Sequence, residues 1–311
     1  MVQRHPVILR PEGGSRIIAI GTTGIICQNA CLPNQVIKAP LRHDICGCDE
    51  DVVKTILHDE EYAMSCFERE RTIYAQLPKN INILDCIAIE DDRLHFPFLR
   101  LGNLRDYLAS HNKIIGSQLR DQWIDAAIDA IALVHRFEIV HADISTRNFL
   151  VADDLSIRLC DFSGSSMGNQ PSLVEEEDRY RISPNAPRSI ATDIFALGCL
   201  IFEIMTGNRP YDEIPDDACE EIERRYAIGA FPLLKENVYE KIILKCWTLQ
   251  YVDVKQVKQD MKTIREEKIS HSHTEMTVTS YLLTVTPVIL LISGIILVSR
   301  RKLWDLWHVT S

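Results

Sequence analysis

The chain has 311 residues, of which 46% are hydrophobic and 25% are charged, and its formal net charge is −10. These proportions are typical of a globular protein and exclude wholesale disorder. The acidic balance argues against a nucleic-acid-binding protein, which needs a basic surface to meet phosphates. The ten cysteines follow no secretory leader and have no zinc-ligand spacing, so we expect reduced cytosolic thiols and no structural metal.

The first third of the chain is expected to be rich in strands. Short apolar runs bounded by glycine and proline predict five strands, over residues 17–20, 24–27, 35–38, 82–90 and 94–99. Residues 1–15 hold two prolines and two glycines, which predicts a flexible arm. Residues 41–55 are polar and lack a period, which predicts an inserted loop. Apolar side chains at helical spacing predict one helix over residues 58–77.

Helical periodicity dominates the rest of the chain. Apolar residues recur at helical spacing over residues 123–134, 194–205 and 239–247. Strands followed by helices favour an α+β fold built from two lobes.

Two polar segments in the middle of the chain carry a pattern suited to phosphoryl transfer. They are His141-Ala-Asp-Ile-Ser-Thr-Arg-Asn148 and Asp161-Phe-Ser-Gly164. A transferred phosphoryl group must be held in line and neutralised by metal ions, while a carboxylate accepts the proton of the incoming hydroxyl. A second carboxylate and an amide oxygen are ligands that Mg²⁺ prefers.

This pair of segments resembles the catalytic loop and the metal-binding segment of eukaryotic protein kinases. The resemblance implies a two-lobed kinase fold, ATP and Mg²⁺ as cofactors, and a protein substrate. It assigns Asp143 as the catalytic base and Asn148 and Asp161 as metal ligands. Divergent kinase-like sequences of this style are expected in fungi.

Other landmarks of the family can be placed upstream. Ala19-x-Gly21-x-x-Gly24 is similar to the glycine-rich phosphate loop, although a plain hairpin would show the same pattern. Lys38, in Val-Ile-Lys, resembles the lysine that holds the α- and β-phosphates, with Lys54 as a rival. Glu70 resembles its helical carboxylate partner, and Glu68 is the alternative.

The resemblance also implies an adenine site. Residues 96–104 are placed like the hinge between the lobes, where Pro97 would offer its carbonyl and Leu99 its N–H group. Leu150, two residues after Asn148, would form the floor of the adenine pocket, or would serve simply as a core leucine.

Several positions depart from the family pattern. Ala142 replaces the catalytic-loop arginine that normally meets an activation-segment phosphate, so we predict activity that does not depend on such phosphorylation. Ser163 stands for the glycine of Asp-Phe-Gly, and Asn185 for the glutamate of Ala-Pro-Glu, whose usual arginine partner is replaced by Val254.

These departures keep three functions open. An active protein kinase is favoured because Lys38, Glu70 and the three polar residues of the central segments are all present. A pseudokinase that acts as a binding scaffold is the alternative, and a small-molecule phosphotransferase is the third. Residues 193–198 resemble the central C-lobe helix of protein kinases, which argues against the third function.

The substrate is less defined. Ser145 and Arg147 give no firm choice between a Ser/Thr and a Tyr acceptor. The acidic residues between Asp212 and Glu223 hint at basic substrates, although a solvated helix face would have the same composition.

The C-terminal segment is uncharged over Thr277–Ser299, a run of 23 residues. At helical rise this run reaches about 35 Å, enough to cross a hydrocarbon core of about 30 Å. Basic residues and tryptophans follow it, as at a membrane interface. We therefore predict a single-pass anchor with the kinase facing the cytosol. A helix packed on the kinase, or a misread tail, would leave the chain cytoplasmic.

The predicted organisation is a flexible arm, two lobes, a linker, a transmembrane helix and a short tail, over residues 1–15, 16–97, 98–265, 266–276, 277–299 and 300–311.

Overall fold

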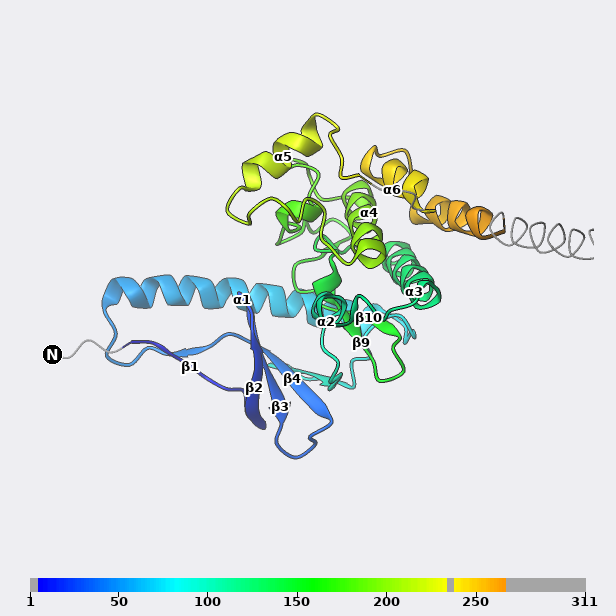
Figure 1. The fold of residues 1–311 in the computed structure, drawn as a ribbon. Helices are drawn as coiled ribbons and strands as arrows, with labels where there is room; N and C mark the ends of the chain where they lie inside the picture. The colour runs from blue at the N-terminus through cyan, green and yellow to red at the C-terminus, as the bar shows by residue number, and fades with distance from the viewer. Residues whose placement is uncertain (1–4, 234–237, 267–311) are drawn as a thin grey trace, which may run out of the picture. The chain divides into compact units, whose positions relative to one another are not determined.

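A computed structural model describes residues 5–233 and 238–266 of the chain (Figure 1). Its N-terminal part is a five-stranded antiparallel sheet in the order β2-β3-β4-β7-β6. The strands are β2 (Gly14–Ile20), β3 (Gly24–Asn29), β4 (Gln35–Pro40), β7 (Leu94–Pro97) and β6 (Ala88–Ile89). One face of this sheet is buried around Ile25, Cys27 and Ala39, as alternation along half-buried strands requires.

Helix α1 (Glu50–Gln76) packs against β4, extends past the sheet at its N-terminal end (Figure 1), and begins eight residues before the predicted His58. Asp49 caps it by accepting a hydrogen bond from the Asp51 N–H group. Most side chains of its first two turns are exposed, so no buried apolar stripe marked them in the sequence. The prediction of a loop over residues 41–55 was therefore wrong at its C-terminal end.

The predicted arm and one predicted strand also differ from the structure. Strand β1 (Val7–Ile8) pairs with β5 (His43–Asp44), so part of residues 1–15 is held in a ribbon, and β2 begins at Gly14. Of residues 82–90, only β6 is a strand of the sheet. Ile83 and Leu84 are buried apart from that sheet, where Ile83 bridges to Leu159.

The C-terminal lobe is helical and is built around α4 (Ile190–Thr206), which is buried along nearly its whole length. Helices α3 (Ser117–Arg136) and α6 (Glu240–Trp247) pack against it. The remaining helices of the described chain are α2 (Leu104–His111), α5 (Cys219–Ala227), a helical segment over residues 254–266, and the short 3₁₀ turns η1 (Thr146–Asn148) and η2 (Asp178–Tyr180).

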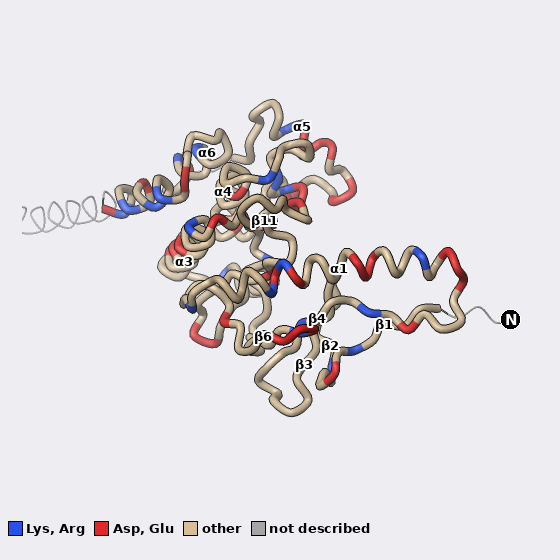
Figure 2. Tube along the Cα trace, turned by 180° about the vertical axis from the view of Figure 1, so that it is seen from behind, with Lys and Arg blue, Asp and Glu red and all other residues tan. Residues whose placement is uncertain are grey.

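Two small strand pairs lie in the same lobe and position the polar segments. Strand β9 (Phe149–Val151) pairs with β10 (Ile157–Leu159), and β8 (Ile139–Val140) pairs with β11 (Ser166–Met167). The segment His141–Asn148 is thus held at both ends by strands. Charged residues of both signs are interspersed along α1 and over the helical lobe (Figure 2).

The chain divides into two compact units, Met1–Lys258 and Gln259–Ser311. In the second unit the described residues, 259–266, are helical. Within the described ranges no helix is long and apolar enough to cross a membrane. The linker, the predicted span at 277–299 and the tail lie outside those ranges, except for residue 266 of the linker, so the anchor stays a prediction.

A substitution at Gly198 tests the contact between α4 and α6. A Cβ at this position would lie 2.7 Å from the Cys246 Cβ and 3.2 Å from the Trp247 ring. We expect Gly198→Ala to lower the free energy of unfolding by about 1–3 kcal/mol, because overpacking a tight helix contact forces the backbones apart. Chemical denaturation measures this change.

Ser65→Ala, on an exposed position of α1, is the control and should change stability by less than about 0.5 kcal/mol. A Gly198→Ala protein as stable as the wild type would contradict the close helix contact.

Candidate active site

Three charged residues from distant parts of the chain meet between the sheet and the helical lobe. The Lys38 Nζ atom lies 2.6 Å from Glu70 Oε2 and 2.8 Å from Asp161 Oδ1. The Glu70 side chain is 1% exposed and that of Lys38 is 14% exposed. A carboxylate this deeply buried needs a charged partner, since leaving one alone costs several kcal/mol. The ion pair therefore fixes α1 against β4.

Electrostatics favour the charged forms of Lys38 and Asp161, whereas burial raises the pKa of Glu70. Burial disfavours the charged ammonium, but the Asp161 and Glu70 carboxylates outweigh it and raise the pKa of Lys38 above its usual range. Burial likewise opposes ionisation of Asp161, but Lys38 and the Ser163 hydroxyl hold the pKa of that carboxyl well below its usual range. The Ser163 Oγ donates to Asp161 Oδ1 at 2.8 Å.

Lys54 and Glu68, the alternatives that the sequence offered, lie outside this cluster. The Lys54 side chain is 72% exposed and pairs with Asp51. Glu68 pairs with Arg71 on the surface of α1. The structure thus brings Lys38 and Glu70 together, and it places neither rival in the cluster.

The segment His141–Asn148 is held by hydrogen bonds to Asp193, the fourth residue of α4. The buried Asp193 carboxylate accepts hydrogen bonds from the N–H groups of His141 at 2.8 Å and Ala142 at 2.9 Å, and one from the His135 ring at 2.8 Å. Ala142 has φ = +64°, a conformation disfavoured for residues with a Cβ. The two hydrogen bonds to Asp193 help to offset that strain.

Asp143 and Asn148 face each other across this segment. The Asn148 Nδ2 atom donates to the Asp143 carbonyl at 2.6 Å and to its Oδ2 at 2.8 Å. Burial raises the pKa of Asp143 to about 7; the Asn148 hydrogen bond opposes the shift, and the Asp161 and Glu177 charges add to it. A carboxyl with this pKa can exchange a proton near neutral pH.

An aromatic column connects α1 with the same segment. The Tyr74 ring lies 5.2 Å from Phe162, and Phe162 lies 5.3 Å from His141, measured between centroids. Phe96 of β7 adds a fourth ring, 5.1 Å from Tyr74. Sequence reasoning placed Tyr74 only on the apolar side of a helix. Its contact with Phe162 depends on the packing of the lobes and had no local signal.

The glycine-rich segment forms a tight hairpin between β2 and β3. The Gly21 N–H group donates to the Gly24 carbonyl at 2.8 Å and so closes the turn. A Cβ on Gly24 would lie 3.2 Å from the Ala39 carbonyl oxygen and 3.7 Å from the Lys38 Cε atom. Glycine at 24 therefore lets this strand pass close to the lysine.

The predicted adenine residues lie near the end of β7. The Phe98 N–H group bonds to the Asn34 carbonyl, whereas the Leu99 N–H group meets no acceptor in the described part of the chain. Pro97 ends the strand. Leu150 of β9 is half-buried and bridges to Asn103, just beyond this segment.

The oxygens of Asn148 and Asp161 suit a magnesium ion. The Asn148 nitrogen is engaged by Asp143, and the Asp161 Oδ1 atom by Lys38 and Ser163. No hydrogen bond within the described residues engages the Asn148 Oδ1 or the Asp161 Oδ2 atom. These are hard oxygen donors, but two side chains are too few for a complete magnesium shell, so nucleotide phosphates and water would supply the rest.

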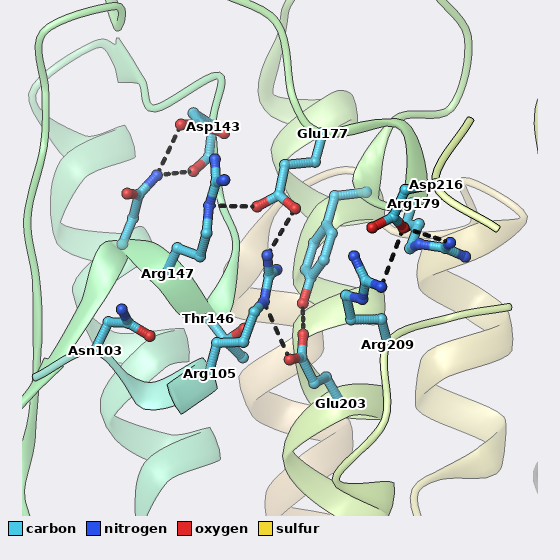
Figure 3. Close-up of polar contacts among 12 residues, drawn as sticks. Asn103, Arg105, Asp143, Thr146, Arg147, Glu177, Arg179, Glu203, Arg209 and Asp216 are labelled. Carbon is cyan, nitrogen blue, oxygen red and sulfur yellow. Dashed lines mark hydrogen bonds and ion pairs between the residues drawn. The ribbon is translucent and has the colours of Figure 1, made fainter. Parts of the chain in front are cut away.

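A second charged network, absent from the sequence analysis, lies beside Asp143 (Figure 3). The Glu177 carboxylate forms ion pairs with Arg105, 2.8 Å from Oε2, and with Arg147, 3.0 Å from Oε1. Arg105 also contacts Glu203 at 3.3 Å, and the Tyr180 hydroxyl donates to the same carboxylate. Arg105 and Glu177 are 72 positions apart, so no local pattern could have paired them.

The segment that follows also departs from expectation. Asn185, placed where the family has glutamate, is exposed, and Val254 is buried. A buried ion pair between Glu176 and Arg188 lies in this segment instead.

Comparison with known proteins agrees with this arrangement. Residues 34–266 match the family described as protein tyrosine and serine/threonine kinase. The chain is 23% identical over 233 residues to Probable serine/threonine-protein kinase PknB of Lactococcus lactis, covering 68% of this chain and 36% of that protein. It is 26% identical over 161 residues to Tyrosine protein-kinase src-1 of Caenorhabditis elegans, covering 47% of this chain and 30% of that protein.

A third relative is Tyrosine-protein kinase csk-1 of Caenorhabditis elegans, 27% identical over 203 residues, or 60% of this chain and 37% of that protein. The chain thus spans about a third of the length of these relatives. The family match covers about three quarters of the chain, and the chain therefore belongs to the protein kinase superfamily.

Proposed function

We propose that this chain transfers the γ-phosphate of Mg-ATP to a hydroxyl group of a protein substrate. The observation that carries the proposal is the joint placement of Lys38, Glu70 and Asp161 in one cluster, with Asp143 and Asn148 paired beside it. Phosphoryl transfer needs positioning and charge neutralisation more than covalent chemistry. In the proposed reaction this arrangement would supply both.

Each residue has a role in the proposed reaction. Lys38, oriented by Glu70, would hold the α- and β-phosphates. Asp161 and Asn148 would hold Mg²⁺, which neutralises phosphate charge when bound. Pro97 and Leu99 would position adenine through the backbone, Gly21 and Gly24 would shape the loop over the phosphates, and Leu150 would support the base. This set of roles follows the family resemblance together with the geometry.

Asp143 would orient the acceptor hydroxyl and receive its proton at a carboxylate oxygen. Asn148 holds the carboxyl through its Nδ2 atom, which limits the rotation of the Asp143 side chain. The acceptor, Ser/Thr or Tyr, is the part of the proposal that an experiment must decide.

The direct test is transfer of labelled γ-phosphate from Mg-ATP to a mixed pool of Ser, Thr and Tyr peptides by the full chain. Asp143→Asn should lower turnover by about 10²- to 10⁴-fold, because it removes the general base, and nucleotide binding should persist. Asp153→Asn, the same change at an exposed position ten residues further along the chain, should retain wild-type turnover. The labelled residue identifies the acceptor class.

A folded wild-type chain that binds Mg-ATP and transfers no phosphate to any peptide would contradict this proposal. That result would favour a binding scaffold.

The pKa of Asp143 predicts the pH dependence. Because this pKa is raised to about 7, the carboxylate fraction grows as pH rises through 7. The value of kcat/KM should therefore fall about tenfold per pH unit below this midpoint. Glu177→Gln removes a charge that raises the pKa of Asp143, so the midpoint should move to lower pH.

Glu175→Gln is the matched control, because Glu175 is exposed and pairs with Arg181 instead. If the Glu177→Gln and wild-type proteins had the same midpoint, a group other than Asp143 would control the fall of kcat/KM at low pH.

The network around Glu177 also bears on regulation. Its carboxylate lies between Arg105 and Arg147, the arrangement that a phosphate on this segment would otherwise have to create. Tyr180 is fully buried and thus inaccessible to a modifying kinase. We therefore expect unphosphorylated protein, phosphatase-treated protein and Ser172→Ala to have equal peptide turnover. An increase in turnover that follows phosphorylation of Ser172 would refute this independence.

A further inference from the structure

Four arginines line one cavity beside Asp143. Arg105, Arg147, Arg179 and Arg209 surround a space of about 320 Å³ together with three carboxylates, Glu177, Asp178 and Asp216, and with Ile222. Figure 3 shows them in two pairs, Arg105 and Arg147 at Glu177, and Arg179 and Arg209 at Asp216. They are separated widely in sequence, so only the fold brings them together.

The buried member of the set is held mainly by uncharged groups. The Arg179 side chain is 4% exposed and donates to the backbone carbonyls of Pro210, Tyr211 and Ile214. Carbonyl oxygens fix the direction of a guanidinium and leave its net charge in place. The acidic partner of Arg179 is Asp216, at 2.8 Å.

Asp216 bridges two arginines from an exposed position. Its Oδ1 atom lies 2.8 Å from Arg179 and 3.1 Å from Arg209, yet its side chain is 71% exposed. An ion pair with so exposed a carboxylate is weak. An incoming anion that offers two or three oxygens can therefore replace Asp216 between these guanidinium groups.

Arg147 brings the cavity close to the reacting centre. Its Nε atom contacts Glu177 at 3.0 Å, while its side chain is 54% exposed. Within the described residues its terminal nitrogens have no hydrogen-bond partner. Arg147 lies four positions after Asp143, and its charge acts on that carboxyl. The free donors thus lie where residues flanking an acceptor hydroxyl would pass.

The acidic segment from Asp212 to Glu223 is partly neutralised by arginines. Most of its carboxylates are already paired with arginines of this lobe, as seen for Asp212, Glu213, Asp216, Glu221 and Glu223.

We propose that the arginine-lined cavity is a subsite for an anionic side chain of the protein substrate, close in sequence to the phosphorylated hydroxyl. The shared chemistry is a carboxylate or a phosphate held by Arg147, Arg179 and Arg209. The proposal rests on the kinase activity proposed above and names its substrate class. A neighbouring cavity of about 780 Å³, also lined by Arg105 and Arg209, gives the substrate chain room to continue.

The test compares peptides that differ at one position near the acceptor, which carries Ala, Lys, Glu or phosphoserine. With the full chain, kcat/KM should be at least about tenfold higher for an anionic peptide than for the Ala peptide, as charge-assisted hydrogen bonds predict. A larger gain for phosphoserine identifies a phosphate site, and an equal or larger gain for Glu a carboxylate site. Equal rates for all four peptides, or a preference for Lys, would overturn the proposal.

Matched variants locate the subsite. Asp216→Asn removes the exposed internal anion and should increase the anionic preference, whereas Asp217→Asn, the same change one residue away on an exposed position, should leave the preference as in the wild type. Arg209→Gln should reduce it, and Arg224→Gln on α5, outside the cavity, should not. Equal effects of Asp216→Asn and Asp217→Asn would show a general charge effect and refute the site.

Binding measurements separate this proposal from the enzymatic one. Fluorescence anisotropy of labelled Glu, phosphoserine and Ala peptides with the full chain needs no turnover. If no peptide is phosphorylated but the anionic peptides bind more tightly and Arg209→Gln weakens them, the proposed activity fails and the subsite stands. If peptides are phosphorylated without any anionic preference in binding or rate, the activity stands and the subsite fails.

Discussion

The rest of the structure depends on the buried contact of Lys38 with Glu70. Glu70 is almost completely inaccessible to water, and a carboxylate in that position is tolerated only beside a cation. The requirement fixes the rotation of α1 about its axis and its distance from β4. It also brings Asp161 of the other lobe onto the same ammonium, so one lysine connects a strand, a helix and a loop.

A second carboxylate performs the equivalent task inside the helical lobe. Asp193 is fully buried on α4 and accepts three hydrogen bonds, two of them from the backbone of the segment that contains Asp143. The left-handed conformations of Ala142 and Asp161 are costly for such residues. They persist because Asp193 holds the first, while Lys38 and Ser163 hold the second.

The region beside Asp143 is organised by arginine, although the chain as a whole is acidic. Burying a guanidinium requires ordered acceptors, and here backbone carbonyls and glutamates provide them. Glu177 and Glu203 balance Arg105, while Arg147, Arg179 and Arg209 retain donors or exposed partners. The net charge of the chain therefore describes its surface on average. It does not describe the local electrostatic potential beside Asp143.

The sequence by itself determined the lobed α+β organisation and the central strands and helices, because alternating and helical periods record which faces are buried. It also marked Asp143, Asn148 and Asp161, since their spacing lies within one short stretch. It missed the first turns of α1, where exposed side chains leave no period, and the β1–β5 ribbon. It favoured Lys38 over Lys54 and Glu70 over Glu68, but it kept both rivals open because they also fit the local pattern.

Only the tertiary structure decided those choices. It alone also brings together the Tyr74–Phe162–His141 column and the arginine-lined cavity. Lys38 and Asp161 are 123 positions apart, and contacts over such separations arise from the packing of whole elements. Periodicity reports the environment of a residue relative to its neighbours in the chain. It carries no information on which distant side chain completes that environment.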